Sequence, residues 1–147
     1  LLAHQGFKHH HWWKKGQAQG QPSQTKAIVL DVDDTTLATW NYEVFSNWAF
    51  NPTTNATYVL GQLFPPVPGM VDMVTQAAQE GYAIIYITGR PALQEPATLG
   101  NLTADGVGVD AGYPAPTKLN DGEDGLFTKP LPADYPREVN THEYSIQ

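Results

Sequence analysis

Ala27-Ile28-Val29-Leu30-Asp31-Val32-Asp33-Asp34-Thr35 is the stretch that decides the fold of this chain. Its continuous aliphatic run predicts a buried strand, which leads directly into three carboxylates within four residues. Like charges crowded at a strand end are costly unless a cation or a reacting group is bound there. The segment is therefore both a fold signal and a candidate functional site.

A second apolar run, residues 82–87, predicts another buried strand. Apolar side chains recur at helical spacing before it and predict a helix over residues 70–80, which Gly81 closes. The members of this apolar face are Val71, Val74 and Ala78. A strand, a crossover helix and a second strand form a parallel unit that is right-handed almost without exception.

The second run ends in Thr88-Gly89-Arg90. The carboxyl ends of neighbouring parallel strands meet at one edge of a sheet, and ligands of open α/β folds bind there. We therefore expect Asp31, Asp33 and Thr88 to converge on a single crevice.

About 50 residues separate the two runs, whereas a minimal crossover needs roughly 12. The surplus is an aromatic-rich insertion over residues 36–64, predicted to lie at the carboxyl end of the first strand. A helix is predicted over residues 39–50, ended by Asn51-Pro52. The rings either pack on one another, which we favour, or line a pocket for an apolar leaving group, with Tyr42 and Glu43 as first candidates for substrate contact.

The rest of the chain gives weaker signals. Pro91 predicts the first position of a helix reaching about Asp105, and residues 107–110 predict a short strand. From Tyr113 onward, Pro, Gly, Asp and Lys predict no helix. Residues 1–26, which include three adjacent histidines, predict an N-terminal arm and a linker.

Composition limits the class of protein. The 147 residues suffice for one domain with a sizeable core, and residues 27–147 are assigned to it. A net charge of −7 with eight Lys and Arg argues against a nucleic-acid surface. No apolar stretch is long enough to span a membrane. The absence of cysteine excludes disulfides and thiol catalysis.

A secreted, extracellular protein is expected from the abundance of Gln, Asn, Thr, Pro and Gly and from a start at Leu1 rather than Met. Two tripeptides match glycosylation sequons, Asn55-Ala56-Thr57 and Asn101-Leu102-Thr103.

The two strand ends, taken together, resemble the first two motifs of the haloacid-dehalogenase (HAD) superfamily of phosphohydrolases. Asp31-Val32-Asp33-Asp34-Thr35 and Ile87-Thr88-Gly89-Arg90 are closest to its secreted acid phosphatase branch, the class B and C type. The resemblance covers about residues 26–112. It implies a Rossmann-like α/β fold, a parallel sheet with flanking helices and a small cap, about residues 38–66, inserted between the two motifs.

The resemblance also implies Mg²⁺-dependent hydrolysis of a small phosphate monoester. Asp31 would be the nucleophile that forms an aspartyl-phosphate, and Asp33 would protonate the leaving group and activate water. Both would bind the Mg²⁺ ion, Asp33 through its main-chain carbonyl. Thr88, Gly89 and Arg90 would contact the phosphate. For Arg90, a structural pair with an acidic residue is an equal alternative, and Asp34 is expected to cap the following turn.

The superfamily has a third-motif lysine and a fourth-motif acidic pair that the sequence does not identify. Lys118 and Lys129 lack the expected context, as do the acidic residues Asp121, Glu123 and Asp124. We expect the 147 residues to stop before those motifs. Two rival hypotheses remain: a non-catalytic phosphate- or metal-binding module with the same fold, and a glycosyltransferase that uses Asp31 and Asp33 to hold a sugar nucleotide and its metal.

Overall fold

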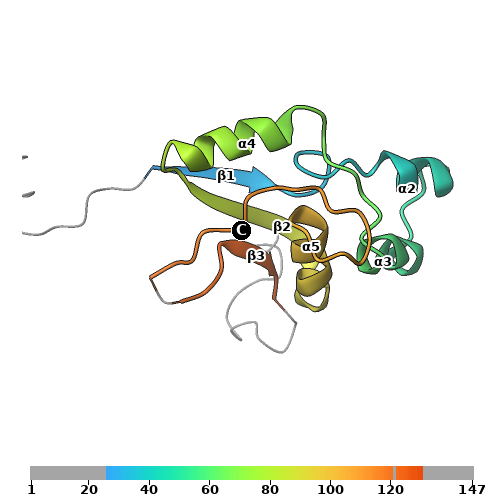
Figure 1. Ribbon diagram of the computed structural model, residues 1–147. Helices are drawn as coiled ribbons and strands as arrows, with labels where there is room; N and C mark the ends of the chain where they lie inside the picture. Colours follow the sequence, from blue (N-terminus) through green and yellow to red (C-terminus); the bar gives the residue numbers. More distant parts are fainter. Residues whose placement is uncertain (1–25, 121, 131–147) are drawn as a thin grey trace, which may run out of the picture.

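The computed structural model describes residues 26–120 and 122–130, and a parallel sheet lies at the centre of this part (Figure 1). Its strands are β1 (Ala27–Asp31), β2 (Ala83–Pro91) and β3 (Leu126–Lys129), in the order β1-β2-β3. The register pairs Asp31 with Ile87. Thr88 therefore lies one residue beyond the partner of Asp31, which confirms both predicted strands and the shared edge.

The crossover helix α4 (Met70–Gln79) confirms the helix predicted before β2. It follows Gly69, whose φ of 80° is favourable for glycine, and Asp72 in its first turn complements the helix dipole. Val74 is fully buried, and Gly81, with a φ of 86°, follows the helix end. Figure 1 shows α4 lying along the sheet beside β1.

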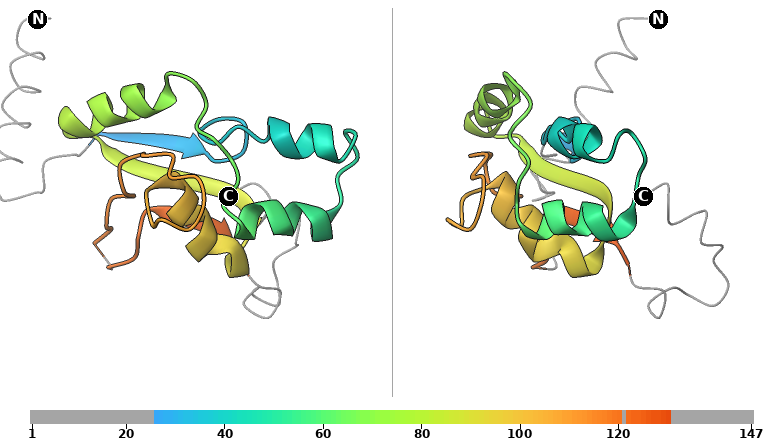
Figure 2. Two further views of the ribbon diagram at one scale, coloured as in Figure 1. Left: turned by 45° about the vertical axis from the view of Figure 1, so that its right-hand side comes forward. Right: turned by 90° about the vertical axis from the view of Figure 1, so that its right-hand side faces the viewer.

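The insertion forms two short helices, α2 (Trp40–Phe45) and α3 (Pro52–Leu60), beyond the carboxyl end of β1 (Figures 1 and 2). The expected position of the cap is confirmed, but the helix predicted over residues 39–50 is too long. Asn51-Pro52 begins α3 instead of ending α2, because the Asn51 side chain accepts hydrogen bonds from the N–H groups of Thr53 and Thr54.

The segment after β2 differs from the prediction. Pro91 is the last residue of β2, followed by a 3-10 turn η1 (Ala92–Gln94) and helix α5 (Glu95–Leu102). Pro96 is the proline of the first helical turn. Residues 107–110 are irregular, so the strand predicted there was wrong, and β3 was not predicted.

Buried aliphatic and aromatic side chains join the sheet, α4 and the cap in one core. Its largest fully buried members are Tyr42, Tyr86, Phe64, Leu37, Ile84 and Leu102. In the described part of the chain, no helix is long and apolar enough to cross a membrane.

Asn101 is a buried polar residue of this core and holds the cap against α5. Its Nδ2 donates to the main-chain oxygens of Phe64 and Val109, both at 2.8 Å. The side chain is fully buried, so the second sequon is not available for glycosylation in the folded protein.

Candidate active site

Asp31 is the last residue of β1 and lies at the carboxyl edge of the sheet. Asp31 is exposed, and its Oδ1 accepts a hydrogen bond of 2.7 Å from the Val32 N–H. Thr36 closes the loop after β1, because its hydroxyl donates to the main-chain oxygens of Asp31 and Val32. The carboxylate is thus held on one side while it remains open to solvent.

Asp34 has a structural contact, as the sequence predicted. Its carboxylate accepts hydrogen bonds from the N–H and the hydroxyl of Thr39, the residue that precedes α2. Its φ of 58° is left-handed, a conformation that aspartate tolerates better than most residues. Asp34 therefore turns the chain from β1 into the cap.

Asp33 pairs with Arg90 across the two strands. Arg90 Nε lies 3.2 Å from each carboxylate oxygen of Asp33, and Nη2 lies 2.7 Å from Oδ1. The two residues are 57 positions apart in the sequence. The parallel register therefore brings the ends of both motifs into contact.

Arg90 is enclosed on its other sides. Its Nη1 donates to the Thr98 hydroxyl on α5 at 3.1 Å. The guanidinium carbon lies 5.3 Å from the ring centroid of the buried Phe64, within cation–π range. The structure therefore shows Arg90 in an ion pair with an acidic residue, which was the alternative to a phosphate contact. The phosphate contact of Arg90 stays a prediction.

Thr88 and Gly89 directly precede Arg90 on β2. The Thr88 side chain is buried, and its oxygen accepts from the Arg90 N–H at 3.2 Å. Since that bond uses an oxygen lone pair, the hydroxyl proton is still available for donation. Gly89 is exposed, and a Cβ built on it would meet no heavy atom within 4 Å.

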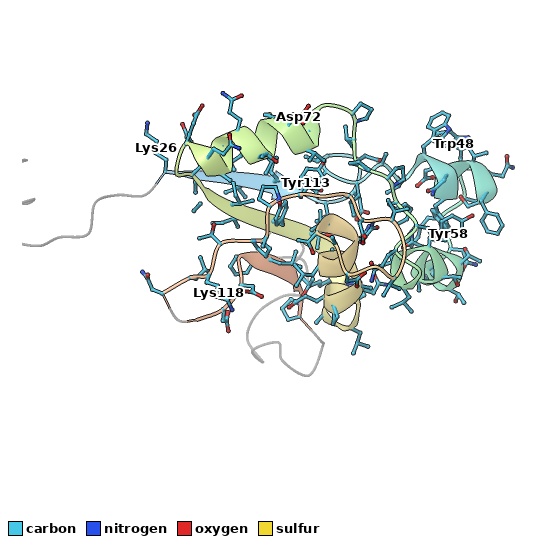
Figure 3. The ribbon with its side chains drawn as sticks, viewed as in Figure 1. Lys26, Trp48, Tyr58, Asp72, Tyr113 and Lys118 are labelled. Carbon is cyan, nitrogen blue, oxygen red and sulfur yellow. The ribbon has the colours of Figure 1, made fainter. Side chains whose placement is uncertain are left out.

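Tyr113 positions the loop after β1, a role that no sequence pattern indicated. Its hydroxyl donates to the Thr36 main-chain oxygen at 2.6 Å, and the Val67 N–H donates to the same oxygen at 2.9 Å. Burial raises the pKa of Tyr113 to about 12. Tyr113 is labelled in Figure 3. It lies 77 residues after Thr36 in the sequence.

Most cap rings pack on one another. The Tyr42 hydroxyl donates to the Asn51 main-chain oxygen, and the Tyr42 ring meets Tyr58 at 5.3 Å. Trp40 and Trp48 are exposed and contact each other edge to face at 5.1 Å (Trp48 and Tyr58 in Figure 3). Packing is therefore the main role of Tyr42, in line with the alternative that the sequence favoured.

Within the described residues, neither lysine considered for the third motif forms an ion pair with an acidic residue of the loop after β1. Lys118 forms an ion pair with Asp124 at 3.3 Å (Figure 3). It lies near the amino-terminal half of β2, because the N–H of the neighbouring Thr117 donates to the main-chain oxygen of Ile84. Lys129 ends β3 opposite Pro91. Asp121 and the N-terminal arm, with its histidines, lie outside the described residues.

The donors at the site are hard oxygens, the kind of ligand that Mg²⁺ takes. Among residues 26–120 and 122–130, no three acidic or histidine side chains form a metal-binding group. Mg²⁺ is commonly held by one or two carboxylates, with water and substrate phosphate completing its shell. The Asp31 carboxylate, which is exposed and has no protein cation as a salt-bridge partner within the described residues, fits this mode of binding.

Comparisons with known proteins agree with the geometry. The model of the HAD superfamily, subfamily IIIB (acid phosphatase), matches residues 5–125. No curated protein sequence matches the chain. Among solved structures, the class C acid phosphatase from Bacillus anthracis with tungstate bound is similar, with a TM-score of 0.60 and 22% identity over 95% of this chain and 53% of that one.

A second structure of the class C acid phosphatase from Bacillus anthracis has a TM-score of 0.60 and 23% identity, over 90% of this chain and 52% of that one. This chain therefore spans about half the length of the structures it matches. The likeness confirms the α/β fold with a parallel sheet, flanking helices and cap.

Proposed function

Because the chain belongs to subfamily IIIB of the HAD superfamily, the acid phosphatases, we propose that the protein hydrolyses phosphate monoesters through an aspartyl-phosphate on Asp31. The observation that carries the proposal is the shared edge of β1 and β2. There the register pairs Asp31 with Ile87, next to Thr88 and Gly89. The substrate is a small phosphate ester, and the protein is secreted.

Asp31 is the nucleophile in this proposal. Its carboxylate is exposed, and the Val32 N–H fixes one oxygen at 2.7 Å. An orientation fixed before the reaction lowers the entropy lost in reaching an in-line attack on phosphorus. A carboxylate oxygen of Asp31 bonds to phosphorus as the bond from phosphorus to the ester oxygen breaks.

Asp33 transfers the protons. It gives a proton to the departing ester oxygen and later takes one from the water that attacks the aspartyl-phosphate. That second attack releases inorganic phosphate and restores the Asp31 carboxylate. The Asp33 side chain is 42% exposed, so it is open to substrate on the side away from Arg90.

The main-chain N–H of Gly89 and the hydroxyl of Thr88 hold phosphoryl oxygens. Open space around Gly89 supports this role, because a phosphoryl group can approach the amide closely where no Cβ intervenes. Mg²⁺ would be held by the Asp31 carboxylate and the Asp33 main-chain carbonyl. When bound, it would offset repulsion between the carboxylates and the phosphate dianion.

A non-catalytic phosphate-binding module is the second candidate. It is favoured by one observation: among the described residues, no lysine forms an ion pair with Asp31 or Asp33. The family assignment gives no support to a glycosyltransferase.

The test is turnover of p-nitrophenyl phosphate with Mg²⁺ by the full-length protein and by Asp31→Asn. We expect the variant to lose at least roughly 10³-fold in kcat, since it lacks the nucleophile. Asn keeps an oxygen for the Val32 N–H, so the free energy of unfolding should change by less than about 0.5 kcal/mol. Normal turnover in the variant would remove the mechanism. Phosphate binding by a wild-type protein that turns over no ester would favour the module.

A further inference from the structure

We propose that Arg90 is a positioning residue, which holds the Asp33 carboxyl in the orientation needed for proton transfer and does not bind substrate phosphate. This inference rests on the proposed phosphatase activity and assigns Arg90 a different role from the one that the family resemblance implied.

The first support is that all three guanidinium nitrogens bind protein oxygens. Nε and Nη2 take the Asp33 carboxylate, with contacts of 2.7 to 3.2 Å. Nη1 takes the Thr98 hydroxyl at 3.1 Å. A phosphate bound side-on through Nε and Nη2 would have to displace the Asp33 carboxylate.

The second support is burial. The Arg90 side chain is 4% exposed, whereas the Asp33 side chain is 42% exposed. Phe64 covers the guanidinium face, and Thr98 is fully buried. The carboxyl is therefore held from the protein side and open on the other, as a group that exchanges protons with substrate and water must be.

The third support is the path of β2. Thr88 and Arg90 both lie on its buried side, and exposed Gly89 lies between them. The Arg90 N–H donates to the Thr88 oxygen. One strand therefore carries Gly89, the proposed phosphate-binding residue, on its exposed face and the support for Asp33 on its buried face.

A fixed Asp33 matters most when the leaving group needs a proton. In the first step, the Asp33 proton moves to the ester oxygen as its bond to phosphorus breaks. An alkoxide is a poor leaving group and requires this proton, whereas p-nitrophenolate is a stable anion and leaves without it. Loss of correct orientation should therefore slow glycerol phosphate much more than p-nitrophenyl phosphate.

The experiment compares kcat/KM for these two esters in the wild type, Arg90→Lys and Thr98→Val. Lys keeps the charge but cannot hold the carboxylate from two nitrogens. Val matches threonine in shape but removes the acceptor for Nη1. The matched control is Thr98→Ser, which keeps that acceptor.

We expect Arg90→Lys to raise the ratio of p-nitrophenyl phosphate to glycerol phosphate turnover by roughly tenfold or more, within the range that proton transfer contributes. Thr98→Val should shift the ratio in the same direction by a few-fold, and Thr98→Ser should leave it unchanged. Partial unfolding lowers both rates by one factor, so it does not alter the ratio.

Two results would refute the positioning role of Arg90 but leave the proposed phosphatase activity intact. One is an unchanged ratio in Arg90→Lys and Thr98→Val, with inhibition by inorganic phosphate as in the wild type. The other is an equal loss for both esters with weaker inhibition by inorganic phosphate, which would assign Arg90 to the phosphate itself. A wild-type protein without turnover of either ester would refute the proposed function, and this role of Arg90 with it.

Discussion

Gly89→Ala should make the protein more stable and less active. Gly89 lies in β2 between the buried Thr88 and Arg90, and it is exposed. Its φ is outside the left-handed region, and an added Cβ would have no heavy atom within 4 Å. The fold therefore does not require glycine at this position.

The expected sizes of the gain in stability and of the loss in activity both follow from that geometry. Alanine at a compatible backbone position restricts the unfolded chain and adds about 0.4–1 kcal/mol to the free energy of unfolding. In the proposed site, the same methyl group occupies the space through which a phosphoryl oxygen approaches the Gly89 amide. Loss of one such donor costs roughly 10²–10³-fold in rate, so we expect a fall of about that size in kcat/KM.

The assays are urea unfolding and turnover of p-nitrophenyl phosphate with Mg²⁺. Gly125→Ala is the matched control, because its Cβ would lie 2.8 Å from the Thr117 oxygen and 3.0 Å from the Ile84 oxygen, both main-chain atoms. That variant should lose about 1–3 kcal/mol of stability and keep its activity per folded molecule. Wild-type kcat/KM in Gly89→Ala would refute the approach of phosphate to this amide.

Two further predictions concern the support of the site. Asn101→Leu should lower the free energy of unfolding by roughly 2–4 kcal/mol in urea titrations, because buried main-chain oxygens of Phe64 and Val109 lose their donor; a loss below 1 kcal/mol would contradict this role. Stability should also fall at alkaline pH: burial raises the pKa of Tyr113 from 10.0 to about 12, so the unfolded chain loses this proton first. The stabilisation is complete below pH 10 and disappears as the pH rises through about 12. Tyr113→Phe should flatten that decline in unfolding measurements, and an identical decline would assign it to other groups.

The sequence predicted the elements whose signals are local. The aliphatic run of β1 and the apolar spacing in α4 each lie within one short segment, and both elements form where they were expected. The shared edge then follows because neighbouring parallel strands end at the same edge of a sheet. Four residues of β3 carry no comparable run, and this strand depends on pairing with β2, which is distant in the sequence.

Other features depend on contacts that sequence spacing does not reveal. Asn51-Pro52 is compatible with a helix end or a helix start, and the cap formed by the Asn51 side chain decides for the start. Likewise, Arg90 could have paired with any of several acids or with phosphate. The parallel register selects Asp33, and the folding of α5 adds Thr98 behind it.

The three carboxylates after β1 have different surroundings, and this difference supports the roles proposed for them. Asp34 accepts hydrogen bonds from Thr39 and turns the chain into the cap. Asp33 is held by the buried cation Arg90. Asp31 is exposed, and within the described residues its contact is a main-chain N–H, with no cationic side chain as a salt-bridge partner. An anion at a strand end that is left without a protein cation is suited to bind Mg²⁺ or to attack phosphorus, because both use its uncompensated charge. The carboxylates of Asp33 and Asp34 each already have a protein partner, so their charge is less available for either use.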